Sequence, residues 1–162
     1  MKGVDFRNRK GFTLIELLII IGIIAILFAV ILIAVDPVRR FAEARNAVRR
    51  EDVRDILEAI LEYTTDFKGN YPSGIDNSPG SVQVLGTYTS GCDSTCTATS
   101  PAETSCLDIS PSLVETYLSE IPPDPAYGSA GNTDYYVDKT TGGRIIVGAC
   151  DPERGETIKV AR

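Results

Sequence analysis

Hydrophobic and polar positions divide the chain into three stretches. The side chains of residues 12–35 are apolar except near the beginning, and no polar side chain occurs from residue 17 to residue 35. A helix over residues 12–35 would be about 36 Å long, and the hydrocarbon core of a bilayer is roughly 30 Å thick. This stretch therefore predicts a membrane-spanning helix.

Residues 36–68 show the alternation of apolar and charged positions that is typical of an amphipathic helix. The charged side chains, Arg49 and Asp52 among them, are predicted to fill the positions outside the apolar face. The apolar face consists of Val53, Ile56, Leu57, Ile60, Thr64 and Phe67, preceded by a weaker stripe of Phe41, Ala44, Ala47 and Val48.

Both ends of this helix carry recognisable signals. The pair Asp36-Pro37 predicts a kink or local break near Val35, because proline lacks a backbone N–H and disfavours helical geometry in the residue before it. The alternative is a simple boundary, with a new helix that begins at Pro37 and is capped by Asp36. At the other end, Gly69 is predicted to stop the helix.

Residues 69–162 alternate between short apolar runs and loops rich in Gly, Pro, Ser and Thr. A short helix is expected over residues 110–118, with Ser110 as its cap. Tyr135 and Tyr136 are neighbours in a strand, so one ring is expected in the core and the other at the surface. These runs predict an α+β fold in which the long helix packs on a small antiparallel sheet. The C-terminal strands are predicted at residues 134–139, 144–150 and 156–161, with a possible further strand at 82–89.

The composition argues against several classes of function. The 162 residues include no histidine, and their net charge is -6. Without histidine the chain lacks the commonest general base and the commonest metal ligand, and it contains neither a G-x-S-x-G motif nor a phosphate-binding loop. An acidic protein also binds nucleic-acid backbones poorly. We therefore predict that the protein is not an enzyme, and its charge does not imply nucleic acid as a partner.

The charges are unevenly distributed along the chain. Residues 1–11 have a net charge of +3, residues 12–35 contain one charge, and residues 56–162 have a net charge of -9. An excess of Lys and Arg keeps a segment in the cytoplasm, so the acidic part is predicted to be extracytoplasmic. The apolar run is too long for a cleaved secretory signal peptide, and no small-residue cleavage site follows it. A plain membrane anchor would leave Glu16 unexplained, because a carboxylate in a spanning helix is unfavourable.

The sequence KGFTLIELLI at residues 10–19 places a basic leader, Gly11, Phe12 and Glu16 directly before the apolar run. This combination resembles the processing motif of type IV pilins and pseudopilins. The resemblance implies cleavage after Gly11 by a prepilin peptidase, methylation of the new amino group of Phe12, and assembly into a helical filament through the N-terminal helix. The chain would then divide into a removed leader (1–11), a filament-core helix (12–35), an extracytoplasmic helix (36–68) and a head (69–162).

The same resemblance implies a structural subunit of a pilus-like surface filament that serves adhesion, motility or DNA uptake. The subunit would first be a single-pass protein of the cytoplasmic membrane, with its N-terminus in the cytoplasm and its head outside. Its partners would be the prepilin peptidase, membrane lipid, an assembly platform, and other copies of itself or related pilins. Two alternatives stay open: a pseudopilin of a type II secretion or competence machine, and a monomeric membrane-anchored binding module.

Phe12 and Glu16 are four residues apart and lie on the same side of a helix. After cleavage Phe12 would carry an ammonium group, and in hydrocarbon this charge and the Glu16 carboxylate each need a partner. The carboxylate can reach the ammonium of a neighbouring subunit at another height, which would couple charge neutralisation to subunit insertion. We favour this intersubunit pair. The alternative is a local pair within one chain, near the helix N-terminus.

The four cysteines all lie in the predicted extracytoplasmic part, where disulfides persist. Their spacing lacks the paired knuckles of a four-cysteine zinc site, so we predict disulfides and no structural metal. Three pairings are possible. We favour Cys106–Cys150, because Cys150 ends a predicted central strand and Cys106 precedes the short helix, together with a small loop closed by Cys92–Cys96.

Two groups of charged residues have more than one interpretation. The basic residues between positions 39 and 54 would contact lipid head groups or acidic neighbours in a filament, and a solvated face of mixed charge is the alternative. Four aspartates surround predicted turns and would suit calcium, as in some major pseudopilins, but they lack EF-hand spacing and acidic residues are common in turns, so no cofactor is predicted. These aspartates are Asp124, Asp134, Asp138 and Asp151.

Overall fold

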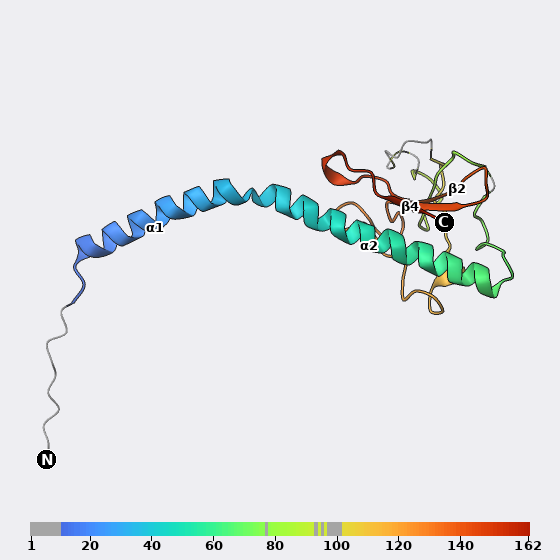
Figure 1. Cartoon of the computed structure of the whole chain (residues 1–162), viewed down its shortest axis with the longest axis horizontal. Coiled ribbons are helices and arrows are strands. Elements are labelled where there is room, and N and C mark those ends of the chain that lie inside the picture. The colour runs from blue at the N-terminus through green and yellow to red at the C-terminus, as the bar shows by residue number, and fades with distance from the viewer. Residues whose placement is uncertain (1–10, 77, 93, 95, 97–101) are drawn as a thin grey trace, which may run out of the picture. The chain divides into compact units, whose positions relative to one another are not determined.

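The computed structural model describes residues 11–162 except residues 77, 93, 95 and 97–101, so most of the predicted leader lies outside the described residues (Figure 1). Helix α1 spans Leu14–Val35 and helix α2 spans Pro37–Asp66. No residue of α1 is buried, and within the described part of the chain α1 is the one helix long and apolar enough to cross a membrane. The chain forms two compact units that divide between Arg40 and Phe41.

Local backbone geometry separates α2 from its neighbours at both ends. Asp36 adopts left-handed φ and ψ values of 44° and 74° between the two helices. Its Oδ1 accepts a hydrogen bond from the N–H of Arg39 (3.3 Å), so Asp36 caps a helix that begins at Pro37. At the other end, Gly69 has a φ of 91° and donates its N–H to the carbonyl of Thr64 over 2.8 Å, which closes the last turn near the predicted stop.

The head contains a four-stranded antiparallel sheet in the order β1–β2–β3–β4. The three C-terminal strands lie inside their predicted ranges. The fourth comes from the segment 82–89, where Gln83 and Val84 pair with Val137 and Tyr136 of the adjacent strand. The sheet therefore has one strand more than the three predicted for the C-terminus. The strands are β1 (Gln83–Val84), β2 (Tyr135–Lys139), β3 (Ile145–Ala149) and β4 (Lys159–Ala161).

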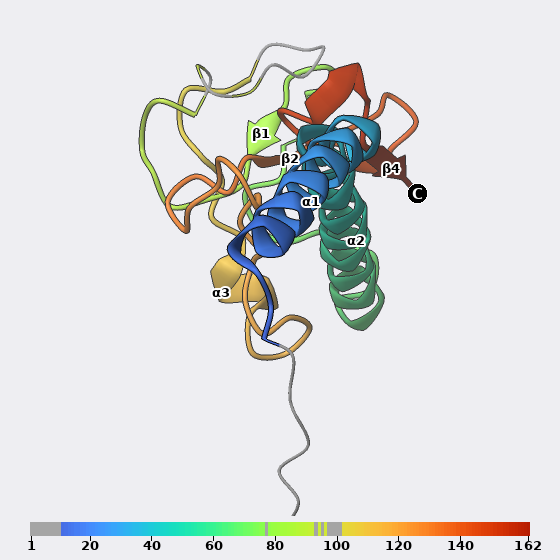
Figure 2. The same ribbon diagram turned by 90° about the vertical axis from the view of Figure 1, so that its left-hand side faces the viewer.

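One face of the sheet packs on α2, which runs alongside it (Figures 1 and 2). Val53, Ile56 and Ile60 of α2 are completely buried in one cluster with Tyr135 and Val137 of β2. The helical residues are three or four positions apart and the strand residues two apart, so each set lies on a single face of its element. The chain thus has a pilin-like α+β fold, in which a long apolar helix precedes a helix packed on an antiparallel sheet.

The opposite face of the sheet is covered by the loop that carries cysteines. Tyr136 is only 6% exposed and clusters there with Cys92 and Cys150. Its ring lies over Gly148 of β3, where an added Cβ would approach a ring carbon to 2.5 Å. The prediction that one of the two neighbouring tyrosine rings lies at the surface is therefore wrong: Tyr135 faces α2, and Tyr136 lies beneath the disulfides.

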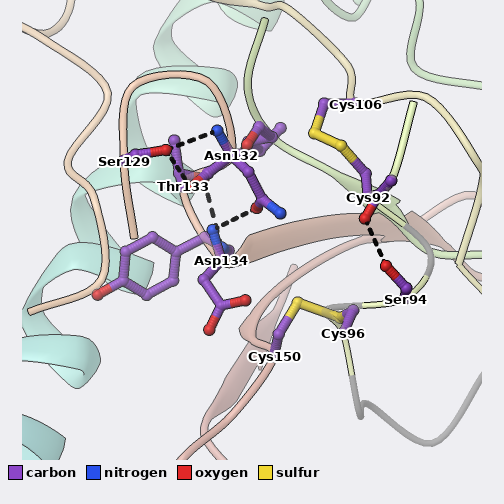
Figure 3. The surroundings of a disulfide bond; sticks show 12 residues. Cys92, Ser94, Cys96, Cys106, Ser129, Asn132, Thr133, Asp134 and Cys150 are labelled. Atoms are coloured by element: carbon purple, nitrogen blue, oxygen red, sulfur yellow. Dashed lines mark hydrogen bonds between the residues drawn. A yellow bond between two sulfur atoms is a disulfide. The ribbon is translucent and has the colours of Figure 1, made fainter. Parts of the chain in front are cut away.

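The structure pairs Cys92 with Cys106 and Cys96 with Cys150 (Figure 3). The favoured pairs Cys106–Cys150 and Cys92–Cys96 are therefore wrong. The segment that precedes Cys92 runs beside the segment that contains Cys106. A hydrogen bond joins the two segments: the N–H of Cys106 donates to the carbonyl of Tyr88 over 2.9 Å. This brings the Cα atoms of Cys92 and Cys106 to 5.4 Å, and Cys96 lies next to Cys150 with a Cα separation of 4.5 Å.

Disulfide mapping of the unreduced protein tests this pairing. Digestion at Asp93 and Glu103 separates Cys92, Cys96 and Cys106 onto different peptides. We expect mass spectrometry to recover Cys92 linked to Cys106 and Cys96 linked to Cys150, with no alkylated thiol before reduction, because the folded head holds each pair within disulfide range. A peptide that links Cys92 to Cys96 would contradict the structure.

The predicted length and cap of the short helix are also wrong. Helix α3 covers only Ser110–Leu113, because Val114 is extended and Glu115 has a φ of 71°, and its cap position is Ile109 rather than Ser110. The weaker apolar stripe at the start of α2 is exposed, and its Phe41 is 65% exposed. Phe67, which directly follows α2, is also half exposed and stacks on the ring of Tyr63 in that helix.

Candidate functional site

The first turn of α1 is closed by a capping box between Thr13 and Glu16. The Thr13 hydroxyl accepts a hydrogen bond from the N–H of Glu16 (3.3 Å), and the Glu16 carboxylate accepts one from the N–H of Thr13 (3.4 Å). These bonds satisfy donors that a helix start leaves unpaired. The predicted site does not include Thr13, although the spacing of Thr13 and Glu16 is the sequence signature of this box.

Gly11, Phe12 and Glu16 lie together at the start of α1, and all three are exposed. Phe12 is 75% exposed. A Cβ added to Gly11 would meet nothing within 4 Å. The fold of the described chain therefore does not itself require glycine at this position, and the peptide bond that follows Gly11 is open to an enzyme.

Helix α1 presents apolar side chains on all sides. Its leucines, isoleucines, valines and Phe28 are exposed by 40% or more. A helix that is apolar all round is stable when lipid or other apolar helices surround it. In either environment the Glu16 carboxylate is the one charged side chain of the helix, so it needs a cationic or hydrogen-bonding partner.

A second cluster of charges joins α2 to the loops of the head. Arg49 is fully buried and donates two hydrogen bonds to the Asp124 carboxylate, at 2.5 Å and 3.0 Å. It also donates to Glu153 (3.0 Å), which accepts a further bond from Arg45 (2.5 Å). The amide oxygen of Asn46 accepts from Arg49 (2.8 Å) and from the N–H of Glu153 (3.1 Å). We call these five residues the Arg49 cluster.

Hydrogen bonds within the cluster shift the pKa values of Arg49 and Glu153. Burial alone would lower the pKa of Arg49, but its hydrogen bonds to Asp124 and Glu153 outweigh burial and raise that pKa above the ordinary value. The hydrogen bond from Arg45 is the main reason why the pKa of Glu153 falls to about 2. Arg49 and Glu153 therefore stay charged across the physiological pH range, and the cluster holds two loops of the head on α2.

The sequence predicts that Arg49 lies outside the apolar face of α2. This prediction is wrong, because Arg49 is buried against the head. Arg49 precedes Val53 by four residues, and Val53, Ile56 and Ile60 continue the same side of the helix. An arginine in line with a buried stripe is a usable signal for an acidic partner, because a buried guanidinium must be paired. The identity of that partner, Asp124, depends on the tertiary fold.

Two of the four aspartates considered for calcium are engaged by other groups of the head. Asp124 binds Arg49, and Asp138 accepts a hydrogen bond from the N–H of Gly80 over 3.3 Å. Asp134 is only 2% exposed, and its Oδ2 has no hydrogen-bond partner in the part of the chain that the structure describes. Among the described residues, no three Asp, Glu, His or Cys side chains are grouped so that they could hold a metal ion.

Asp134 makes stability depend on pH. Burial is the main reason why its pKa rises to about 7, and the charges of Asp151 and Asp124 add to this effect while Arg49 opposes it. The folded state therefore binds a proton that the unfolded state releases near pH 4. The stability associated with this proton is present at low pH and is lost as the pH rises toward 7.

Asp134→Asn is expected to remove this pH dependence. As the pH rises from 5 to 8, the unfolding free energy of the variant should increase by on the order of 1–3 kcal/mol relative to that of the unsubstituted protein. The reason is that the variant carries no buried charge at the higher pH. Urea unfolding of the full chain in detergent, followed by tyrosine circular dichroism, measures the difference. Asp55→Asn, at an exposed position of α2, is the control and should show no such trend. If the unfolding free energies of Asp134→Asn and of the unsubstituted protein changed with pH in the same way, the prediction would be contradicted.

Residues 6–32 match the family model described as the prokaryotic N-terminal methylation motif. No curated protein and no solved structure matches the chain. The matched segment contains Gly11, Phe12, Thr13 and Glu16 together with most of α1, and it does not extend into α2 or the head.

Proposed function

We propose that this chain, which carries the prokaryotic N-terminal methylation motif of type IV pilins and pseudopilins at residues 6–32, is a structural subunit of a pilus-like surface filament. A prepilin peptidase would cleave it after Gly11, and the new amino group of Phe12 would be methylated. Assembly would proceed through α1. Proteins of this class are generally structural subunits rather than enzymes, and the apolar helix is consistent with membrane anchoring before assembly.

The observation that carries the proposal is the complete exposure of α1. This 22-residue helix is apolar almost throughout and contains no buried residue. It therefore requires lipid in one state and, once outside the membrane, other apolar helices. Identical helices from other copies would supply this apolar environment, and a bundle of them would form the core of a filament.

The contacts of Glu16 support an assembly role. Its hydrogen bonds to Thr13 are long, at 3.3–3.4 Å, and both donors are uncharged. The ammonium of a neighbouring Phe12 would be a stronger partner, because bonds between charged groups are shorter and roughly twice as strong as neutral ones. A subunit that enters the filament would therefore be stabilised when its carboxylate meets this ammonium.

Gly11→Val tests the first step. We expect the variant to accumulate as uncleaved precursor and to form no filaments, because a branched side chain would crowd the peptidase next to the scissile bond. Intact-mass spectrometry of membrane and sheared surface fractions, together with electron microscopy of the surface fraction, measures both effects. The unsubstituted protein should begin with N-methylated Phe12.

Gly22→Val is the matched control, because it makes the same substitution within α1 at another glycine with no neighbour within 4 Å. It should be cleaved normally. Normal filaments from Gly11→Val, or a mature N-terminus at another residue, would overturn the proposal. Short filaments confined to the cell envelope would identify a pseudopilin instead, and a processed protein that stays monomeric would identify a membrane-anchored binding module.

A further inference from the structure

The two edges of the sheet in the head differ in how far their backbone is covered. Residues 102–107 run along the β1 edge. The N–H of Glu103 donates to the carbonyl of Val82 over 3.0 Å, and the N–H of Leu107 donates to the carbonyl of Val84 over 2.7 Å. Strand β4 forms the opposite edge and, among the described residues, has a neighbouring strand on one side only (Figure 2). The sheet therefore has one covered edge and one open edge.

The register of β4 on β3 determines which backbone groups of the open edge point outward. Arg162 exchanges two hydrogen bonds with Ile145, at 2.8 Å and 3.0 Å. In an antiparallel pair such residues alternate with residues whose N–H and C=O groups point away from the neighbouring strand. Lys159 and Ala161 occupy these alternate positions, are exposed, and have no backbone partner in the described part of the chain. Their N–H and C=O groups are therefore available to a further strand.

A hollow of about 280 Å³ borders this edge, between β4 and α2. Its lining combines apolar residues with two arginines and one glutamate, so the charged side chains leave a net positive charge. Alternate residues of a strand face the same side, so a strand added beside β4 would direct alternate side chains into this hollow. The hollow therefore suits apolar and acidic side chains. The residues concerned are Leu57, Leu61 and Val160 on the apolar side and Arg54, Glu58 and Arg162 on the charged side.

The cations of β4 favour one kind of added strand. Lys159 adds a positive charge on the face of β4 opposite to Val160, because the two residues are neighbours in a strand. Two copies of β4 paired with each other would bring the cations of both copies to one edge, which repulsion between like charges opposes. The same cations attract a strand that carries acidic side chains.

We propose that the open edge of β4 binds an extended, acidic segment of another protein as an additional antiparallel strand. Backbone hydrogen bonds to Lys159 and Ala161 would fix its register, as in other complexes in which a peptide extends a sheet. An apolar side chain opposite Val160 would enter the hollow, and acidic side chains opposite Arg162 and Lys159 would pair with these cations. The inference goes beyond the proposed function and depends neither on cleavage nor on filament formation.

The peptide acetyl-Glu-Thr-Val-Glu-Val-amide is the probe. Aligned antiparallel to β4, it places its glutamates opposite Arg162 and Lys159 and its first valine opposite Val160. The peptide would be titrated into the isotope-labelled full chain in zwitterionic detergent, and amide NMR spectra would be recorded. We expect the largest chemical-shift changes and slowed hydrogen exchange at the N–H groups of Lys159 and Ala161, because these groups gain acceptors.

Backbone N-methylation of the peptide separates strand addition from attraction between charges. Methyl groups on the threonine and the second glutamate, opposite Ala161 and Lys159, block the hydrogen bonds to β4 and should weaken binding roughly tenfold. Methyl groups on the two valines, whose N–H groups point away from β4, are the matched control and should change the affinity by less than about twofold. Replacement of both glutamates by lysine should weaken binding roughly tenfold.

Ala161→Pro tests the same contact from the side of the chain. Proline removes an N–H that points away from β3, so the pairing of β4 with β3 should persist while peptide binding weakens roughly tenfold. Arg54→Gln combined with Arg162→Gln should weaken binding several-fold. Lys68→Gln combined with Arg144→Gln removes the same charge at two other exposed positions and should leave binding unchanged. The methylated peptides test the inference even if Ala161→Pro disturbs the sheet.

Several outcomes would overturn the inference. They are equal binding of the two methylated peptides, equal binding of the lysine peptide, and shift changes that lie away from β4. Shifts at Lys159 and Ala161 that depend on protein concentration without peptide would identify a second copy as the occupant, which also overturns it. Normal surface filaments from a chain that does not bind the peptide would overturn this inference alone, and peptide binding by a chain that forms no filaments would overturn the proposed function alone.

Discussion

Glu16→Ala is expected to reduce surface filaments to a small fraction of the normal amount while membrane insertion and cleavage after Gly11 continue. Insertion should become slightly easier, because a charge leaves the hydrocarbon. Assembly should fail, because the ammonium of a neighbouring Phe12 would lose its carboxylate, and an unpaired buried charge costs several kcal/mol. Quantification of the mature protein in membrane and sheared surface fractions measures the effect.

Two companion variants separate charge from local structure. Glu16→Gln keeps the shape and can still bond to Thr13, so it should assemble poorly if the charge is what matters. Thr13→Ala removes the capping box but leaves the carboxylate, so it should lose only about 1 kcal/mol of helix stability and still form filaments. Normal filaments from both Glu16 variants would mean that Glu16 serves only the start of its own helix.

Arg49→Met is expected to give the largest loss of stability in the head. It leaves Asp124 buried without its cation, and removal of one partner of a buried ion pair typically costs about 3–5 kcal/mol. The melting temperature of the head should fall by about 10 °C. Thermal unfolding of the full chain in detergent, followed by circular dichroism, measures this change.

The rescue variant addresses the cause of that loss. Arg49→Met combined with Asp124→Asn removes the orphaned charge and keeps an oxygen for the N–H groups of Ala126 and Tyr127, so it should recover part of the stability. Arg54→Met, at an exposed position of the same helix, should change stability by less than about 0.5 kcal/mol. A double variant as unstable as Arg49→Met would show that the lost packing of the arginine, and not the unpaired carboxylate, is responsible.

The elements that depend on local pattern could be predicted from the sequence. The apolar run determines α1, and the spacing of Val53, Ile56 and Ile60 determines which side of α2 packs on the sheet. The last three strands are predictable because runs rich in β-branched and aromatic residues lie between turns rich in glycine. The fold class follows from these elements together.

The features that depend on contacts between distant segments could not be predicted in the same way. Spacing alone allowed three cysteine pairings, and the choice is made by the loop before Cys92, which runs beside Cys106. Likewise the partner of Arg49 is 75 residues away in the sequence. The expectation that one of the rings of Tyr135 and Tyr136 lies at the surface fails, because nothing in the strand pattern reveals that a disulfide-bonded loop covers the second face of the sheet.

The interleaved disulfides determine how the head would respond to a pulling force. Cys96 and Cys150 are 54 residues apart in the sequence, and a fully extended segment of that length would reach roughly 180 Å. With the bond closed, tension applied at the two ends of the head cannot draw out this segment, which contains β2 and β3. A loaded subunit would therefore lengthen only in the helices and short tails outside residues 92–150, and reduction would convert the head from a stiff link into a long, compliant tether.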